Sequence, residues 1–293
     1  MRDIKITDVR AVPGDSAFLL DDGKTTIMYD SGFAFTGYRV AENISNILGK
    51  RGLDYVFLTH SHYDHALGSV YAKRRWQNAK VVAGDYATRI FAKPTARAVM
   101  RDLDGKFAKQ CGVNEYEDLI DELCVDIEVK DGDIINAGDM KIRAVALPGH
   151  TKCSVGYYIE ENKLLLGTET IGVYGGDKGV VVPSYLIGYN TALESIRRVK
   201  LMDIDNILVP HYGLLSKSET ADYLAAAEES AVSTAEDIAS ILRAGGSDGD
   251  AFEYFKNRFY HGYIRSIYPI DAMTLNTSIM IKLIRKEIMG QEI

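Results

Sequence analysis

The sequence predicts an α/β fold, in which strands and helices form separate layers. Apolar runs of strand length alternate with segments of helical spacing between residues 54 and 91. Short apolar segments separated by turn residues follow between 124 and 166, and helical spacing dominates beyond residue 215. With 293 residues, the chain can bury a substantial core, as one large domain or two small ones.

The first part of the chain alternates strands with helices. The predicted elements are a hairpin over 17–20 and 25–29, a helix over 40–48, a strand over 54–58, a helix over 67–76, a strand over 80–83 and a helix over 86–91. Residues 94–122 are predicted to be helical, with interruptions at Gly105 and Gly112.

The second part contains short strands and then long helices. The predicted strands are 124–129, 134–135, 141–147, 154–159, 163–166 and 207–209. The predicted helices are 191–201, opened by a Thr191–Glu194 capping box, a long helix from Ser216 to Gly245, and two more over 252–260 and 272–288. We therefore expect one domain over 1–215 and a helical extension over 216–293 that packs on it.

Three imidazoles and a carboxylate occur within six positions, directly after the strand at 54–58. They are His60, His62, Asp64 and His65. Such donors at the carboxyl end of a strand predict a metal site. Imidazole and carboxylate without thiolate favour Zn, with Fe or Mn as alternatives.

Two more histidines follow strands later in the chain. His150 lies on a Pro-Gly turn, and His211 follows Pro210. The strand at 163–166 ends in Gly167 and, two positions on, the carboxylate of Glu169. Because α/β sheets gather their sites at the carboxyl ends of strands, we expect these side chains on one rim of the sheet. His261 lacks that context and is predicted to be structural or at the surface, with a place in a lid as the alternative.

The HxHxDH motif, the later Gly-His, the Gly-plus-acid strand end and the Pro-His together resemble the signature of the metallo-β-lactamase superfamily, over about 15–215. The resemblance implies an αββα sandwich with a dinuclear metal site. It implies that His60, His62 and His150 bind the first metal, and that Asp64, His65 and His211 bind the second.

One position departs from that signature. The family normally places the bridging Asp directly after the Gly, whereas here Thr168 follows Gly167 and the acid is Glu169. In an extended strand this shift would turn the side chain to the opposite face. The longer side chain and the end of the strand favour Glu169 as a bridging or second-metal ligand. The alternative is a weakened second position.

The ligands predict a hydrolase in which metal-bound water is the nucleophile and Asp64 orients it or takes its proton. The helical extension resembles the 2-aminobenzoylacetyl-CoA thioesterase branch of the superfamily, in which helices cover the site. Its many aromatic residues favour an ester or thioester with an apolar acyl part. The alternatives are a phosphodiesterase, a di-iron redox enzyme, which would resemble HxExDH where this chain has His62, and a regulatory protein that keeps the metal site without turnover.

Composition limits the partners. The net charge of −7 argues against nucleic acid and leaves a small-molecule substrate. The three cysteines show no CxxC spacing, the start lacks the apolar core of a signal peptide, and no run of 18 apolar residues suits a membrane. We expect a cytoplasmic protein without membrane contact; a homo-oligomer stays open.

Overall fold

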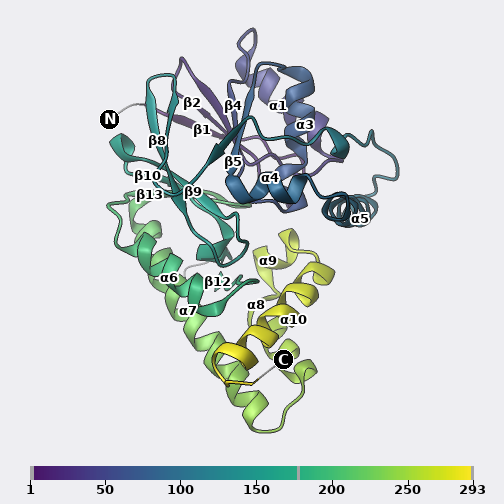
Figure 1. Ribbon diagram of the computed structural model, residues 1–293, viewed down its shortest axis with the longest axis vertical. Coiled ribbons are helices and arrows are strands. Elements are labelled where there is room, and N and C mark those ends of the chain that lie inside the picture. Colours follow the sequence, from purple (N-terminus) through teal and green to yellow (C-terminus); the bar gives the residue numbers. More distant parts are fainter. Residues whose placement is uncertain (1–2, 177–178, 292–293) are drawn as a thin grey trace. The chain divides into compact units, whose positions relative to one another are not determined.

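The computed structural model describes residues 3–176 and 179–291, which alternate strands and helices (Figure 1). Contacts divide the chain into two compact units, which we describe in turn. Unit 1 extends to Ala146 and also takes in Val155–Gly167, and unit 2 comprises Leu147–Ser154 and the chain from Thr168 onward. The predicted boundary at 215, which separates a helical extension from the strand-bearing part, stays a prediction.

The first sheet of unit 1 has six strands among the described residues. In spatial order they are β1 (Lys5–Asp8), β2 (Phe18–Asp21), β3 (Thr26–Tyr29), β4 (Tyr55–Phe57), β5 (Lys80–Gly84) and β6 (Ile127–Val129). The predicted hairpin is confirmed, since β2 pairs with β3 antiparallel and Phe18 lies opposite Tyr29. From β3 to β6 the pairing is parallel. Both faces of such strands are covered, which explains why β3 and β4 are nearly unbroken apolar runs.

Four further strands of unit 1 form an antiparallel run. Their order is β10 (Leu164–Leu166), β9 (Val155–Ile159), β8 (Met140–Ala146) and β7 (Ile134–Ala137). The ring of Tyr157 on β9 lies 4.7 Å from that of Phe57 on β4, and its hydroxyl donates to the Leu58 carbonyl at 2.7 Å. The second run of strands is thus packed on the first sheet where β4 ends.

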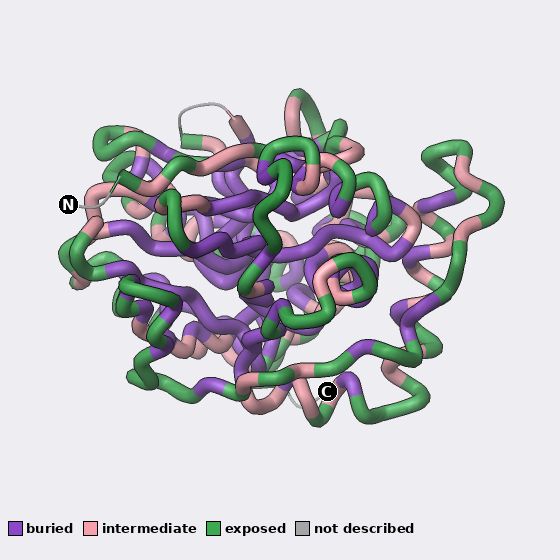
Figure 2. Tube along the Cα trace, turned by 90° about the horizontal axis from the view of Figure 1, so that it is seen from above, coloured by how far each residue is buried: buried purple, intermediate pink, exposed green. Residues whose placement is uncertain are grey.

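The helices of unit 1 cover these strands and connect them. They are α1 (Gly37–Leu48), α2 (Tyr63–Ala66), α3 (Gly68–Arg75), α4 (Asp85–Phe91) and α5 (Pro94–Gln110), with 3-10 turns η1 (Ile120–Glu122) and η2 (Glu160–Asn162). In α1 the apolar spacing puts Val40, Ile44 and Leu48 on the buried face. Figure 2 shows the chain coloured by burial, with buried and exposed stretches alternating along it.

One expectation for unit 1 is wrong. The helix α5 continues through Gly105, where we predicted an interruption, and ends at Gln110, before Gly112 with its φ of 78°. A single Gly costs a helix about 1 kcal/mol relative to Ala, which burial of the apolar Met100 and Ala108 along α5 outweighs.

Unit 2 begins with short elements and ends in long helices. The short elements are η3 (Glu169–Ile171), β11 (Val173–Tyr174), β12 (Val181–Val182), β13 (Asn206–Val209) and β14 (Gly213–Leu215). The helices are α6 (Tyr189–Lys200), α7 (Lys217–Arg243), α8 (Asp248–Phe259), α9 (Gly262–Ile267) and α10 (Ile270–Glu287). Helices α7, α8 and α10 pack against one another (Figure 1). Among the residues described, no helix combines the length and apolarity needed to cross a membrane.

Two helices start away from their predicted positions. Helix α6 begins at Tyr189 rather than at the predicted Thr191, and no side chain caps it. Its Asn190 N–H instead donates to the carboxylate of Glu287 on α10 at 2.9 Å. Helix α8 begins four residues before the predicted Phe252, at a capping box of Ser247 and Asp250. Helix α9 was not predicted.

The predicted start of α7 is confirmed and allows a stability test. Ser216 and Glu219 form a reciprocal capping box. Ser216→Ala is expected to lower the free energy of unfolding by about 1 kcal/mol, because it leaves an amide donor without its partner. Urea unfolding followed by circular dichroism measures this change. Ser240→Ala, at an exposed position within the same helix, is the control and is expected not to destabilise the protein.

Candidate metal centre

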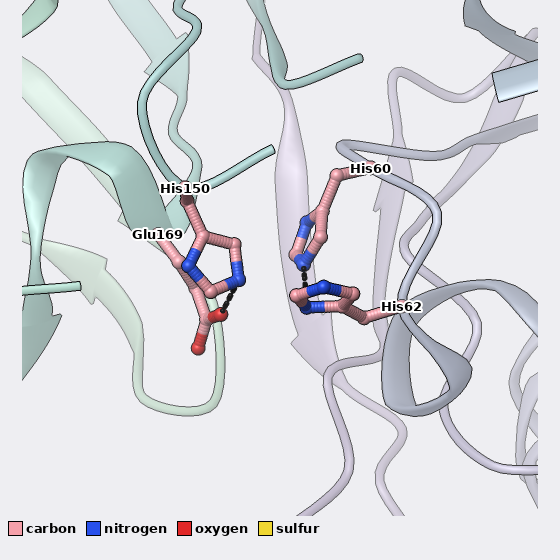
Figure 3. A group of neighbouring side chains, drawn as sticks. All are labelled: His60, His62, His150 and Glu169. Carbon is pink, nitrogen blue, oxygen red and sulfur yellow. Dashed lines mark hydrogen bonds and ion pairs between the residues drawn. The ribbon is translucent and has the colours of Figure 1, made fainter. Parts of the chain in front are cut away.

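The HxHxDH motif follows β4 and leads into α2, so its side chains leave the sheet at the carboxyl end of a parallel strand. His60 and His65 are buried, whereas His62 and Asp64 are half-buried. The Nε2 atom of His60 lies 3.1 Å from the Nδ1 atom of His62 (Figure 3). The Nε2 atom of His65 lies 3.5 Å from an Asp64 carboxylate oxygen. The four donors of unit 1 therefore form two close pairs.

The second ring nitrogens of the two buried histidines have their own partners. The Nδ1 atom of His65 donates to the carboxylate of Asp30 at 2.8 Å. The Thr59 hydroxyl donates to Asp30 as well and lies 3.0 Å from the Nδ1 atom of His60. Because the hydroxyl proton points to Asp30, its oxygen accepts from His60. Both rings thus keep the Nε2 lone pair for another partner, as metal-binding histidines do.

Unit 2 gathers the remaining predicted ligands around one carboxylate. One oxygen of Glu169 lies 2.8 Å from the Nε2 atom of His150 (Figure 3), and the other lies 3.2 Å from the Nε2 atom of His211. All three residues are buried. The Nδ1 atom of His150 lies 2.8 Å from the Ser184 hydroxyl and 3.1 Å from its carbonyl, which orients the ring. Glu169 therefore lies between two histidines predicted to bind different metals.

The local backbone explains how Glu169 reaches these rings. Strand β10 ends at Leu166, Thr168 is extended, and the 3-10 turn η3 begins at Glu169. Strand alternation stops at that point, so the one-residue shift from the family pattern does not place Glu169 on the opposite face. The Tyr223 hydroxyl donates to the carbonyl of Gly172, directly after η3, at 2.6 Å. Burial, and to a lesser degree the charge of Glu169, raises the pKa of this phenol.

His211 occupies the middle of a tight hairpin loop. Strands β13 and β14 pair with Val209 opposite Gly213, which leaves Pro210, His211 and Tyr212 to close the turn. The backbone of His211 is left-handed, with a φ of 63°, a conformation that non-Gly residues rarely adopt. Such strain is typical of functional positions.

The donors and their spacing fit divalent metal ions. Two ligands of a tetrahedral Zn²⁺ ion, each about 2.1 Å from it, lie roughly 3.4 Å apart. The donor pairs are separated by 2.8 to 3.5 Å, and all of them are imidazole or carboxylate. The candidate groups of metal-binding side chains in the described ranges contain all seven predicted ligands and no cysteine.

Sequence reasoning missed several partners of these donors. Asp30 was not among the predicted site residues, although an acid directly after a buried strand could have signalled its role. Nothing in the sequence pointed to Ser184. His261 is exposed, and its Nε2 atom donates to the Arg258 carbonyl at 3.0 Å, which agrees with a structural role.

The fold and the donors together describe a mixed α/β protein with clusters of candidate metal ligands after its strands and with helices in its C-terminal part. The chain belongs to the metallo-β-lactamase superfamily, whose family model matches residues 12–211. This confirms the predicted family and fold. Members of this superfamily are mostly metal-dependent hydrolases.

Three relatives illustrate the likeness. The metallo-β-lactamase fold-containing protein ST1585 of Sulfurisphaera tokodaii is 24% identical over 216 residues, which are 71% of this chain and 77% of that protein. Hydroxyacylglutathione hydrolase of Brucella anthropi is 27% identical over 137 residues, so the match covers 46% of this chain and 40% of that enzyme. The structure of the metallo-β-lactamase family protein TTHA1429 from Thermus thermophilus matches this one with a TM-score of 0.61 at 17% identity. The match covers 94% of this chain and 88% of that protein.

A substitution of Asp30 tests the orientation of His65. Asp30→Asn keeps the size of the side chain but replaces a charged acceptor, and an amide cannot serve Ser16, Thr59 and His65 equally well. We expect metal affinity to fall about 10–100-fold, as is usual for partners of metal-binding histidines. Competition with a metal chelator measures the affinity. Asp54→Asn, which loses an acceptor for the Thr26 amide away from these donors, is the control and should retain it.

Proposed function

We propose that this protein is a hydrolase that uses two divalent metal ions, Zn²⁺ in the first place, to cleave an ester or thioester of a small molecule. The observation that carries the proposal is the position of Glu169. Its two carboxylate oxygens face His150 and His211, one ligand of each predicted metal. This arrangement suits a carboxylate that bridges two cations.

In this proposal the seven donors hold two metal ions, divided as the family resemblance implies. His60, His62 and His150 would hold the first ion, Asp64, His65 and His211 would hold the second, and Glu169 would contact both. The family assignment supports this division, because the matched range 12–211 contains all seven residues. The paired distances within each unit support it as well.

Bound there, the ions would lower the pKa of a water towards neutrality and polarise the carbonyl under attack. Asp64 has the catalytic role among the residues of the chain. Its carboxylate is half-buried beside His65. There it would accept a hydrogen bond from the nucleophilic water and so orient it for attack. Asp30, Thr59 and Ser184 hold the imidazoles of His65, His60 and His150 so that their Nε2 atoms stay in place.

Two observations favour an ester or thioester over a phosphodiester. The names of two matched relatives, hydroxyacylglutathione hydrolases, denote cleavage of an acyl group from a thiol. The net charge of −7 disfavours a nucleic acid as the phosphodiester substrate. The helical part beyond 215 supports a relation to the 2-aminobenzoylacetyl-CoA thioesterase branch.

We propose a small-molecule substrate and no nucleic-acid or membrane partner. None of the three cysteines forms a disulfide, which supports a cytoplasmic location.

Metal analysis together with a substrate panel tests the proposal. We expect about two transition-metal ions per chain, and chelation should abolish hydrolysis until Zn²⁺ is returned. Acyl-CoA thioesters and p-nitrophenyl esters should be cleaved faster than bis-p-nitrophenyl phosphate. Cleavage of the phosphodiester alone would replace the proposal with a phosphodiesterase. Bound iron with redox activity would favour a di-iron redox enzyme, and bound metal without turnover of any compound would favour a regulatory protein.

A further inference from the structure

The turn that carries His211 lacks the residue that its shape favours. A three-residue hairpin loop places one residue in the left-handed region, where Gly is the usual choice. Here that residue is His211, which is also a proposed metal ligand. A side chain in that conformation is disfavoured unless neighbouring groups hold it.

Helix α9 supplies such a group. The hydroxyl of Tyr263 donates a hydrogen bond to the backbone carbonyl of His211. A carbonyl at the tip of a hairpin has no opposite strand to pair with, and His211 is buried, so this donor satisfies a backbone group that water does not readily reach. The contact joins residues that are 52 positions apart in the chain.

Aromatic contacts hold Tyr263 over the turn. Its ring lies 5.5 Å from that of Tyr212, the next residue after His211, at an interplanar angle of 87°. The ring of Tyr212 also lies 4.6 Å from that of Tyr174, at an interplanar angle of 76°. Gly176 allows the close approach of Tyr263, because a Cβ atom there would lie 3.2 Å from the Tyr263 Cβ atom. Edge-to-face contacts of this kind add stability beyond their buried area.

We propose that Tyr263 is a positioning residue for His211: its hydroxyl holds the hairpin loop in the left-handed conformation that directs the imidazole towards Glu169. The proposal rests on the proposed function insofar as His211 binds a metal. It gives the helical extension a task within the metal centre, in addition to any role as a cover. Without the hydroxyl, the loop relaxes, the His211 Nε2 atom leaves its place 3.2 Å from Glu169, and the second metal is bound more weakly.

Two measurements on the full chain test this inference. Amide hydrogen exchange of the metal-free protein reports on the loop, and Tyr263→Phe should speed exchange at 211–213. Titration with Co²⁺, followed by absorption spectroscopy, reports on metal binding. Tyr263→Phe should weaken the second equivalent about tenfold, which corresponds to one hydrogen bond, and leave the first unchanged. Tyr254→Phe, which loses a hydroxyl contact with Asp237 between α7 and α8, is the matched control and should change neither.

Each result supports or overturns a stated role of Tyr263. Faster exchange together with a weaker second equivalent in Tyr263→Phe alone supports the inference. Unchanged exchange or an unchanged second equivalent overturns it. If Tyr263→Leu shows both effects and Tyr263→Phe shows neither, ring packing and not the hydroxyl holds the turn. If wild-type protein binds fewer than two Co²⁺ ions, the dinuclear function fails and the metal-positioning role fails with it, whereas the exchange data still decide whether Tyr263 holds the turn.

Discussion

Asp64→Asn is expected to lower kcat/KM for the ester or thioester substrate about 10²–10⁴-fold. The amide keeps the size of the side chain but has no negative charge and is a poor proton acceptor. The carboxylate lies 3.5 Å from the Nε2 atom of His65, so both groups face the same place, where the nucleophilic water is proposed to be held. Steady-state kinetics with the best substrate of the panel measure the loss, and metal analysis of the variant shows how many ions it retains.

Asp102→Asn is the matched control for this variant. Asp102 is exposed on α5 and pairs with Lys106 at 2.7 Å, one turn along the same helix. Surface ion pairs of this kind contribute little to stability, and Asp102 is not among the proposed ligands, so activity should stay at the wild-type level. Wild-type kcat/KM in a metal-loaded Asp64→Asn protein would remove Asp64 from the mechanism.

Glu169→Gln is expected to have the second large effect, a loss of second-metal affinity and of kcat/KM on the order of 100-fold or more. Loss of a side chain that hydrogen-bonds to a metal ligand already lowers metal affinity or activity about 10–100-fold. Glu169 is proposed to contact both ions directly, so its loss should cost more. Glu169→Asp retains the charge but is one methylene shorter, so its carboxylate cannot stay within 2.8 Å of His150 and 3.2 Å of His211 at once. We therefore expect both variants to bind the first metal more tightly than the second.

Metal stoichiometry after dialysis against a weak chelator shows whether each Glu169 variant retains its second ion. Glu253→Gln, at an exposed position of α8 that pairs with Lys256, serves as the control and should retain two ions. Two tightly bound ions in Glu169→Gln would show that the carboxylate does not bridge. The shifted acid of this chain would then be a buried hydrogen-bond acceptor for His150 and His211.

Local patterns of the sequence were sufficient for most of the fold. The hairpin of β2 and β3, the strand β4 and the capping box at Ser216 were all predicted near their observed positions, because each depends on neighbouring residues in the chain. Two of the errors occurred where distant residues determine the local structure. Glu287 supplies the partner that lets α6 begin early, and packing carries α5 through Gly105.

The sequence by itself determined which donors the protein has and which family it belongs to, because the spacing of HxHxDH and the residues after each strand are local features of the chain. Only the tertiary structure decided where Glu169 points, that Asp30 and Ser184 orient the histidines, and that Tyr263 reaches the His211 carbonyl. These contacts join residues 19 to 52 positions apart, or they depend on how a strand ends. The direction of such side chains is set by packing, and no local pattern encodes it.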